Sequence, residues 1–214
     1  MVGFLQYHGT RVVVWLLVVG AVLTAQRPHW DRVEHFVFIL LPQASFDQYF
    51  GGYADSEGRP GPFGPKDVPN YWAYADLYTL QDHFFSVSDP AALLRAQTDR
   101  LDRAGIGWKD YSGDPDAFLA DCRTESLPAV SFLLPGKIDG PEMAYLTRAV
   151  NGVAGSRLWR RSAVFVSWAG AGDAADHMVP PPGYGPRVPS LVISSWARLA
   201  YNDHRAYSHL SWVR

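Results

Sequence analysis

The sequence predicts an α/β fold, with a mainly parallel central sheet flanked by helices. Apolar runs of strand length alternate along the chain with segments of helical periodicity, and no tight hairpin signal joins consecutive runs. Because these runs are continuous rather than alternating, they suit strands that are covered on both faces. The expected strands are 36–41, 106–111, 129–135, 162–168 and 191–194, and the expected helices are 46–50, 93–104 and 142–156.

Composition agrees with a single globular domain, which we expect over residues 27–214. The chain has 214 residues, of which 48% are hydrophobic and 19% charged, so it can bury a substantial core. Its net charge of -2 and the lack of any Lys/Arg block argue against a nucleic-acid partner. The lone Cys122 excludes an intramolecular disulfide, cannot form a structural zinc site and is expected to be an inert buried thiol.

The N-terminal segment points to export. Residues 12–25 are apolar or small and follow Arg11, but the run is short for a membrane span. Residues 1–26 are therefore predicted to be a signal peptide or, as the alternative, an uncleaved N-terminal anchor. Either places the protein outside the cytoplasm, secreted or in the periplasm or cell envelope, with membrane contact only through this segment.

The first expected strand leads into a turn and a short helix. The apolar run 36–41 stops at Pro42, Ser45 stands where a helix N-cap belongs, and Gly51 follows the helix 46–50. Ligands of open α/β sheets bind in the crevice at the carboxyl ends of the strands. Residues 42–45 should therefore line a functional crevice.

The middle of the chain begins with a loop and an aromatic cluster. Residues 53–69 are rich in Gly and Pro, which prevents regular structure. The aromatic segments 71–78 and 80–85 are expected to belong to the core. Ser88 then precedes Pro90, in a pattern typical of a helix start, so the residues alone favour Ser88 as a helix cap.

Several separated segments, in order, resemble a known family. The stretch from Val33 to Gly51 is similar to I-x-H-I-V-V-x-x-x-E-N-x-S-F-D-x-Y-F-G, the opening of the phosphoesterase family that includes bacterial phospholipases C and acid phosphatases. Residues 101–111 resemble its L-x-x-A-G-I-x-W-x-x-Y, and 162–168 its T-A-I-F-I-T-W. The resemblance implies an alkaline-phosphatase-like fold, here shortened: a stretch after Ser88 is missing, and the C-terminal part of the family domain is expected to be absent.

The resemblance also implies a degenerate metal site. The family carries E-N after its first strand and D-D after the strand 162–168, and these four residues bind the catalytic metal. In this chain the same positions are Pro42, Gln43, Ala169 and Gly170, so no family metal site is intact. We expect the four positions to converge at the carboxyl edge of the sheet. No cofactor is expected unless the protein is active, in which case it needs a divalent metal.

Residues for other catalytic roles of the family are also replaced in this chain. By the resemblance, Ser88 stands at the nucleophile position, facing the same crevice, but Ala91 replaces an Asn that helps to hold the phosphoryl group. Gly140 replaces an active-site His. The alternative is a substitute metal site formed by five other residues: Asp176, His177, Asp203, His204 and His209. The residues alone favour structural hydrogen bonds for these five side chains.

The sequence therefore predicts a phospholipase C-like or acid phosphatase-like phosphoesterase that is catalytically inactive or impaired, a pseudoenzyme. The alternative is an active exported hydrolase that attacks phosphate esters, such as phospholipid head groups, through Ser88 with a substitute metal site. A hydroxyl nucleophile needs a cation or an adjacent base for activation, which favours the inactive form.

Overall fold

A computed structural model describes residues 32–134, 142–173 and 175–213, which belong to one compact unit, Arg32–Arg214. The predicted signal peptide or anchor at 1–26 and the position of Gly140 lie outside the described residues. Within the described residues, no helix is long and apolar enough to span a bilayer.

The centre of the described part is a sheet of seven strands in the order β4-β5-β1-β6-β7-β2-β8. A further small ladder joins β3 and β9 in parallel. The strand bounds are β1 His35–Leu41, β2 Thr79–Gln81, β3 Phe84–Phe85, β4 Trp108–Asp110, β5 Val130–Leu133, β6 Ser162–Trp168, β7 Ser190–Ser194, β8 Tyr201–Asp203 and β9 Tyr207–Ser208.

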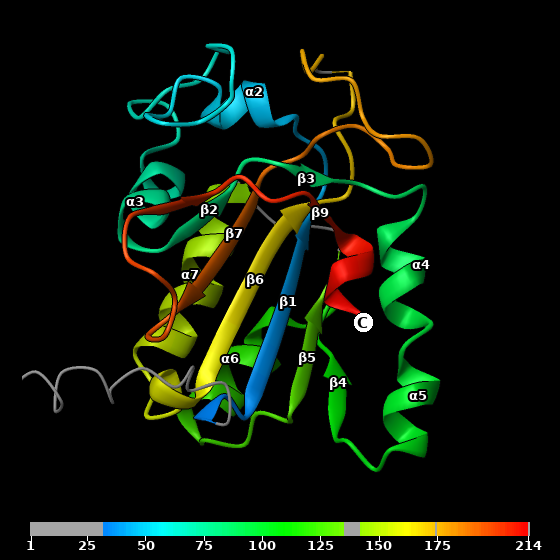
Figure 1. The fold of residues 1–214 in the computed structure, drawn as a ribbon. Coiled ribbons are helices and arrows are strands. Elements are labelled where there is room, and N and C mark those ends of the chain that lie inside the picture. Colours follow the sequence, from blue (N-terminus) through cyan, green and yellow to red (C-terminus); the bar gives the residue numbers. More distant parts are fainter. Residues whose placement is uncertain (1–31, 135–141, 174, 214) are drawn as a thin grey trace, which may run out of the picture. The chain divides into compact units, whose positions relative to one another are not determined.

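The predicted mainly parallel sheet is confirmed. Strands β4, β5, β1 and β6 run parallel, and β1 pairs with β6 over its whole length, from His35 opposite Ser162 to Leu41 opposite Trp168. Strand β7 is antiparallel to both of its neighbours, a direction that its apolar run did not reveal. Strands β1 and β6 therefore end together at the centre of the sheet (Figure 1).

Helices cover both faces of this sheet (Figure 1). The core on one face includes α3, α6 and α7, whereas α4, α5 and the 3₁₀ helix η3 lie on the other. The bounds are α2 Phe46–Phe50, α3 Pro69–Leu77, α4 Pro90–Arg95, α5 Thr98–Arg103, α6 Pro115–Arg123, α7 Glu142–Ala154, η2 Trp159–Arg161 and η3 His209–Trp212.

The two-sided cover explains the unbroken apolar run of β1. Val37, Ile39 and Leu41 pack into the core on the α7 side, while Phe38 and Leu40 pack on the α4 side. All five are buried, and each fully buried side chain of this size stabilises the fold by about 1.5–3 kcal/mol. Packing on both faces fixes the position of the end of β1 and of the turn that follows it.

Two helix predictions need correction. Residues 93–104 do not form one helix: α4 ends at Arg95 and α5 begins at Thr98. Ser88 does not cap α4, because the carboxylate of Asp89 accepts from Ala92 N–H and takes that position. Asp114 caps α6 in the same way, one residue before Pro115.

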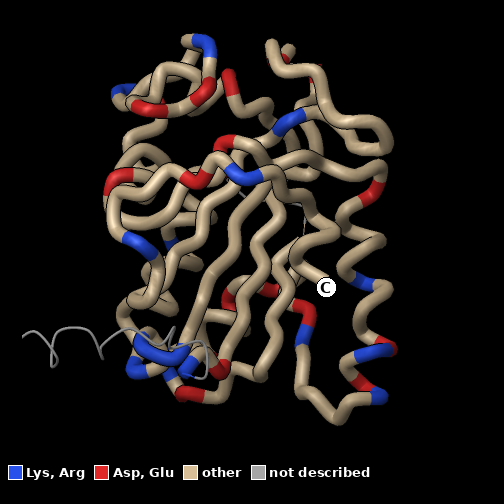
Figure 2. Tube along the Cα trace, viewed as in Figure 1, with Lys and Arg blue, Asp and Glu red and all other residues tan. Residues whose placement is uncertain are grey.

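Charged residues of both signs are interspersed over the loops at the two ends of the sheet and on α4 and α5, whereas the central strands carry few (Figure 2). This distribution follows from burial, since an unpaired charge inside the sheet layers would be costly. The ionisable groups that could carry chemistry are therefore found in the loops after the strands.

Candidate functional site

The turns after β1 and β6 lie side by side at the carboxyl edge of the sheet. Ala169 N–H donates to the carbonyls of Leu41 at 2.9 Å and Pro42 at 3.1 Å, and Ala44 N–H donates to Gly170 O at 2.8 Å. The pairs Pro42-Gln43 and Ala169-Gly170 are thus neighbours, which confirms the expected convergence of these four positions.

The side chains at this junction offer little to a cation. Gln43 is exposed and its amide is the sole side-chain donor or acceptor among the four, since proline, alanine and glycine have none. Gln43 packs against Gly172, where an added Cβ would lie 2.8 Å from Gln43 Oε1. Gly172 also has a φ of 60°, which favours glycine. The residues therefore do not fit a divalent cation, which prefers several oxygen ligands.

The helix that follows β1 brings a carboxylate to the same edge. Ser45 is the N-cap of α2 as predicted, and its hydroxyl accepts from Gln48 N–H at 3.2 Å and donates to Ala175 O at 3.2 Å. The cap fixes the first turn of α2, which carries Asp47. This turn is thereby tied to the segment after β6.

Asp47 forms a first cluster with Asp176 and His177. His177 Nδ1 lies 2.7 Å from Asp47 Oδ2, and His177 N–H donates to the same oxygen at 2.9 Å. Asp47 N–H in turn donates to Asp176 Oδ2 at 3.1 Å. The donor atoms of the three side chains lie close enough together to hold a metal.

A buried guanidinium already supplies the positive charge of this first cluster. Arg187 is fully buried, and its Nη2 and Nε donate to Asp47 Oδ1 at 2.9 Å and Asp176 Oδ1 at 3.0 Å. Its Nη1 donates to the carbonyls of Glu57 and Asp82. Arg187 therefore acts as an internal cation that joins four segments of the chain.

Electrostatics at Asp47 agree with a structural role. Burial alone would raise the pKa of this carboxyl, but hydrogen bonds from the N–H groups of Arg59 and His177, the His177 ring and the charge of Arg187 lower its pKa overall. Asp47 is thus held as an anion by partners that use both of its oxygens. Its negative charge is already paired with the Arg187 guanidinium.

A second cluster gathers around Asp82, which directly follows β2. The Asp82 side chain is fully buried, and its Oδ1 lies 2.8 Å from His83 Nδ1. Its Oδ2 lies 2.9 Å from His204 Nδ1 and also accepts from Glu57 N–H at 3.0 Å. Burial raises the pKa of Asp82, but these hydrogen bonds outweigh it and lower the pKa overall.

The structure does not bring the five predicted substitute ligands together. Asp176 and His177 belong to the first cluster and His204 to the second. Asp203 is bound by Arg205, with Nη2 donating to its Oδ2 at 2.6 Å. His209 is fully buried between the rings of Phe84 and Trp212, at centroid distances of 5.0 and 5.2 Å.

His209 and Ser88 differ from the other candidates. Neither ring nitrogen of His209 has a hydrogen-bond partner among the described residues, and burial lowers its pKa to about 3. Such a ring is an uncharged part of the core. Ser88 is exposed, two residues before α4 begins, so its hydroxyl is open to solvent.

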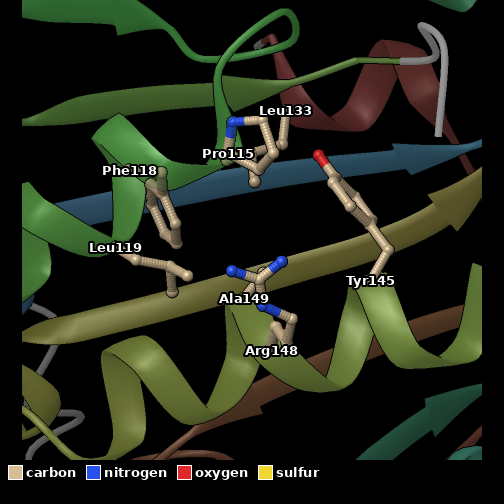
Figure 3. Close-up of a pocket in the computed structure, with 7 residues that line it drawn as sticks. All are labelled: Pro115, Phe118, Leu119, Leu133, Tyr145, Arg148 and Ala149. Carbon is tan, nitrogen blue, oxygen red and sulfur yellow. The ribbon is translucent and has the colours of Figure 1, made fainter. Parts of the chain in front are cut away.

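Two hollows lie elsewhere on the α6 and α7 side. Figure 3 shows the first, between α6, α7 and the end of β5, with a volume of about 10 Å³, which is room for about one water molecule. The second is a wider groove at the C-terminal ends of α6 and α7. These helix ends lead into β5 and β6, so the groove lies at the edge of the sheet opposite Gln43. Neither is built around the two clusters.

A family model described as "Phosphoesterase family" matches residues 94–214, more than half of the chain. The chain belongs to the phosphoesterase family. The match includes the turn after β6, the first cluster's Asp176, His177 and Arg187, and the second cluster's His204. The predicted family membership is therefore confirmed.

One solved structure supports the fold. A protein of the alkaline phosphatase superfamily from Vibrio parahaemolyticus is similar with a TM-score of 0.53 and 11% identity, over 85% of this chain and 64% of that one. This chain thus spans less than two thirds of that protein. The structure of Ps i-CgsB is similar with a TM-score of 0.48 and 8% identity, over 85% of this chain and 70% of that one. The alkaline-phosphatase-like fold is confirmed.

Sequence reasoning missed the residues that carry most of the polar structure. Arg187, Asp82, His83 and Glu57 were not among the candidates. One signal was present: the dipeptide Asp-His occurs at 82–83, 176–177 and 203–204, and each of the three contributes to the polar networks. The first of these stands within an aromatic segment that appeared to be core alone.

Proposed function

We propose that this phosphoesterase-family protein, of the phospholipase C or acid phosphatase type, does not hydrolyse phosphate esters, or does so only weakly. The supporting observation is the meeting of Pro42-Gln43 with Ala169-Gly170 at the carboxyl edge without any carboxylate. Phosphoryl transfer needs developing negative charge to be stabilised. At this junction the side chains provide one amide.

The charged groups nearby do not replace the missing ones. Asp47 and Asp176 both form ion pairs with Arg187, at 2.9 and 3.0 Å, and Arg187 is itself fully buried and hydrogen-bonded. It cannot turn towards a phosphate without leaving two carboxylates unpaired. The first cluster therefore stabilises loops and is not available as a metal or phosphate site.

The test is hydrolysis of p-nitrophenyl phosphate, bis(p-nitrophenyl) phosphate and p-nitrophenylphosphorylcholine, which represent monoesters, diesters and a lipid head group. Each is assayed in chelator and with added Mg²⁺, Mn²⁺, Ca²⁺ or Zn²⁺. We expect no turnover above that of the Ser88→Ala variant, which controls for contaminating phosphatases. Metal-dependent turnover that Ser88→Ala abolishes would instead support the active hydrolase, with a phosphate ester as its substrate.

We also propose that residues 1–26 direct export, as their apolar run after Arg11 suggests. Fusion of this segment to a reporter enzyme that is active only outside the cytoplasm tests the proposal. The mass of the mature protein distinguishes cleavage from anchoring. A reporter that stays inactive in the cytoplasm contradicts export.

A further inference from the structure

We propose that Asp82, His83 and His204 form a binding site for a zinc-class divalent cation. This inference does not rest on the proposed lack of hydrolysis, because none of the three side chains belongs to the junction of β1 and β6. One donor atom from each residue lies within 4.8 Å of the donor atoms of the others.

The sheet itself places two of these side chains. Strands β2 and β8 are parallel neighbours, with Gln81 opposite Asp203, so Asp82 and His204 each directly follow paired strand ends. In the sheet order, β7 and β6 separate β2 from β1, which at about 4.8 Å per strand amounts to roughly 14 Å between β2 and β1. The site therefore shares the carboxyl edge with the family positions but is separate from them.

The charges distinguish this cluster from the first one. In the first cluster a buried arginine forms ion pairs with two carboxylates. Around Asp82, no Lys or Arg side chain within the described residues forms a salt bridge to the carboxylate: its ionisable partners are the His83 and His204 imidazoles. Arg187 reaches only the backbone carbonyl of Asp82, at 3.1 Å. A bound cation would supply the missing positive charge.

The two carboxylates on either side of the His83 ring favour a positive charge there. Its Nδ1 lies 2.8 Å from Asp82 Oδ1, and its Nε2 lies 3.4 Å from Glu57 Oε2. A neutral imidazole has one N–H and can donate to only one of these carboxylates. If Nε2–H donates to Glu57, the Nδ1 lone pair faces Asp82, an arrangement that a metal ion between Nδ1 and Asp82 stabilises. Carboxylates hold metal-bound histidines in this way in many proteins.

The donor set selects the class of metal. Two imidazole nitrogens and one carboxylate suit Zn²⁺, Co²⁺ or Ni²⁺ better than Mg²⁺ or Ca²⁺, which prefer oxygen ligands alone. Bonds of about 2.0–2.1 Å to such a metal place tetrahedral donor atoms roughly 3.3 Å apart. The 2.8 Å contact between Asp82 Oδ1 and His83 Nδ1 must therefore open, while donor atoms that lie farther apart close in. His204, with a side chain 50% exposed, has room to move and leaves the metal open to solvent at a fourth position.

Calorimetric titration of the metal-free full chain with ZnCl₂ tests the site, and the visible absorption of bound Co²⁺ reports its ligand geometry. We expect one zinc equivalent that His204→Gln weakens at least about 100-fold, and that Glu57→Gln weakens about 10-fold by releasing the His83 ring. His177→Gln, in the first cluster, is the matched control and should leave the affinity within about threefold of the original.

Thermal unfolding gives a second readout. Zinc should raise Tm of the original chain and of His177→Gln but not of His204→Gln, because binding stabilises only the folded state. His204 is a partly exposed residue, so the His204→Gln chain should fold. Absence of zinc binding, equal affinity in His204→Gln, or loss of binding in His177→Gln would each overturn the proposal.

Discussion

The guanidinium of Arg187 lies 2.9 Å from the carboxylate of Asp47, although 140 residues separate the two along the chain. Arg187 also packs over the Phe46 ring at 4.5 Å. The pair joins the start of α2 to the loop before β7, and its guanidinium is fully buried. The family segments that contain Asp47, Asp176 and Arg187 are thus held together by one buried cation.

Arg187→Met should lower the free energy of unfolding by about 3–5 kcal/mol, since it leaves the buried carboxylates of Asp47 and Asp176 without their cation. Methionine retains the apolar contact with Phe46, so the lost stability measures the removal of the charge and not a loss of packing. Urea denaturation measures it. The control is Arg148→Met, whose ion pair with Asp116 at 2.8 Å is exposed and should contribute no more than about 1 kcal/mol. Equal effects of the two variants would contradict this assignment.

His209 should make the fold sensitive to mild acid. Its pKa is about 3 in the folded protein and about 6.5 when unfolded, so between these values the unfolded state binds the extra proton. Stability is therefore full above pH 6.5 and falls as the pH is lowered towards 3, by about 2 kcal/mol at pH 5. Urea denaturation at a series of pH values measures this dependence.

The matched variant is His209→Phe, which keeps a ring between Phe84 and Trp212 but cannot be protonated. Its stability should depend less on pH between 6.5 and 4 than that of the original chain. Parallel stability curves for the two proteins would show that His209 has no part in the acid response.

Cys122 should react with thiol reagents only after unfolding. Its side chain is fully buried in the core beside α7, and burial raises the pKa of the thiol to about 12. The reactive thiolate is therefore scarce at neutral pH, and the sulfur is shielded as well. Labelling with a disulfide reagent should follow the urea unfolding transition. Rapid labelling in native buffer would contradict the predicted inert thiol.

The parts of the fold that local patterns specify could be predicted from the sequence. The run 162–168 became β6 with the same bounds, and Ser45 caps α2, because burial on both faces and capping are encoded within a few neighbouring residues. Strand β2, Thr79–Gln81, is short and partly polar. Nothing in such a segment distinguishes a strand from a loop until its neighbours in the sheet are known.

The candidate site was harder to predict for the same reason. Asp82 meets His204 only because β2 and β8 pair in parallel, and Arg187 is buried only because Asp47 and Asp176 are there to neutralise it. Arginine is otherwise almost always exposed. By contrast, the meeting of Gln43 with Ala169 was predicted, because the ends of two long parallel strands fall at one edge.

The junction of β1 and β6 allows a test by restoration: Pro42→Glu, Gln43→Asn, Ala169→Asp and Gly170→Asp together should create affinity for Mn²⁺ or Mg²⁺. The two turns already share hydrogen bonds, and a Cβ at Gly170 meets no atom within 4 Å, so the aspartate there has room. Three carboxylates and an amide oxygen then converge, which is the kind of oxygen site that these cations prefer.

Calorimetry measures the affinity of the new site for Mn²⁺, and thermal unfolding measures how the added negative charge changes stability. In chelator the three added carboxylates repel one another, so Tm should fall below that of the original chain, and Mn²⁺ should restore it. The matched control, Pro42→Gln with Ala169→Asn and Gly170→Asn, adds polar side chains without charge and should show no such metal dependence. Catalysis should stay weak, because Ala91 still lacks the side-chain amide for the phosphoryl group. If the fourfold variant binds no metal and its Tm ignores chelator, the side chains at this edge do not converge, and the proposed loss of a metal site there is wrong.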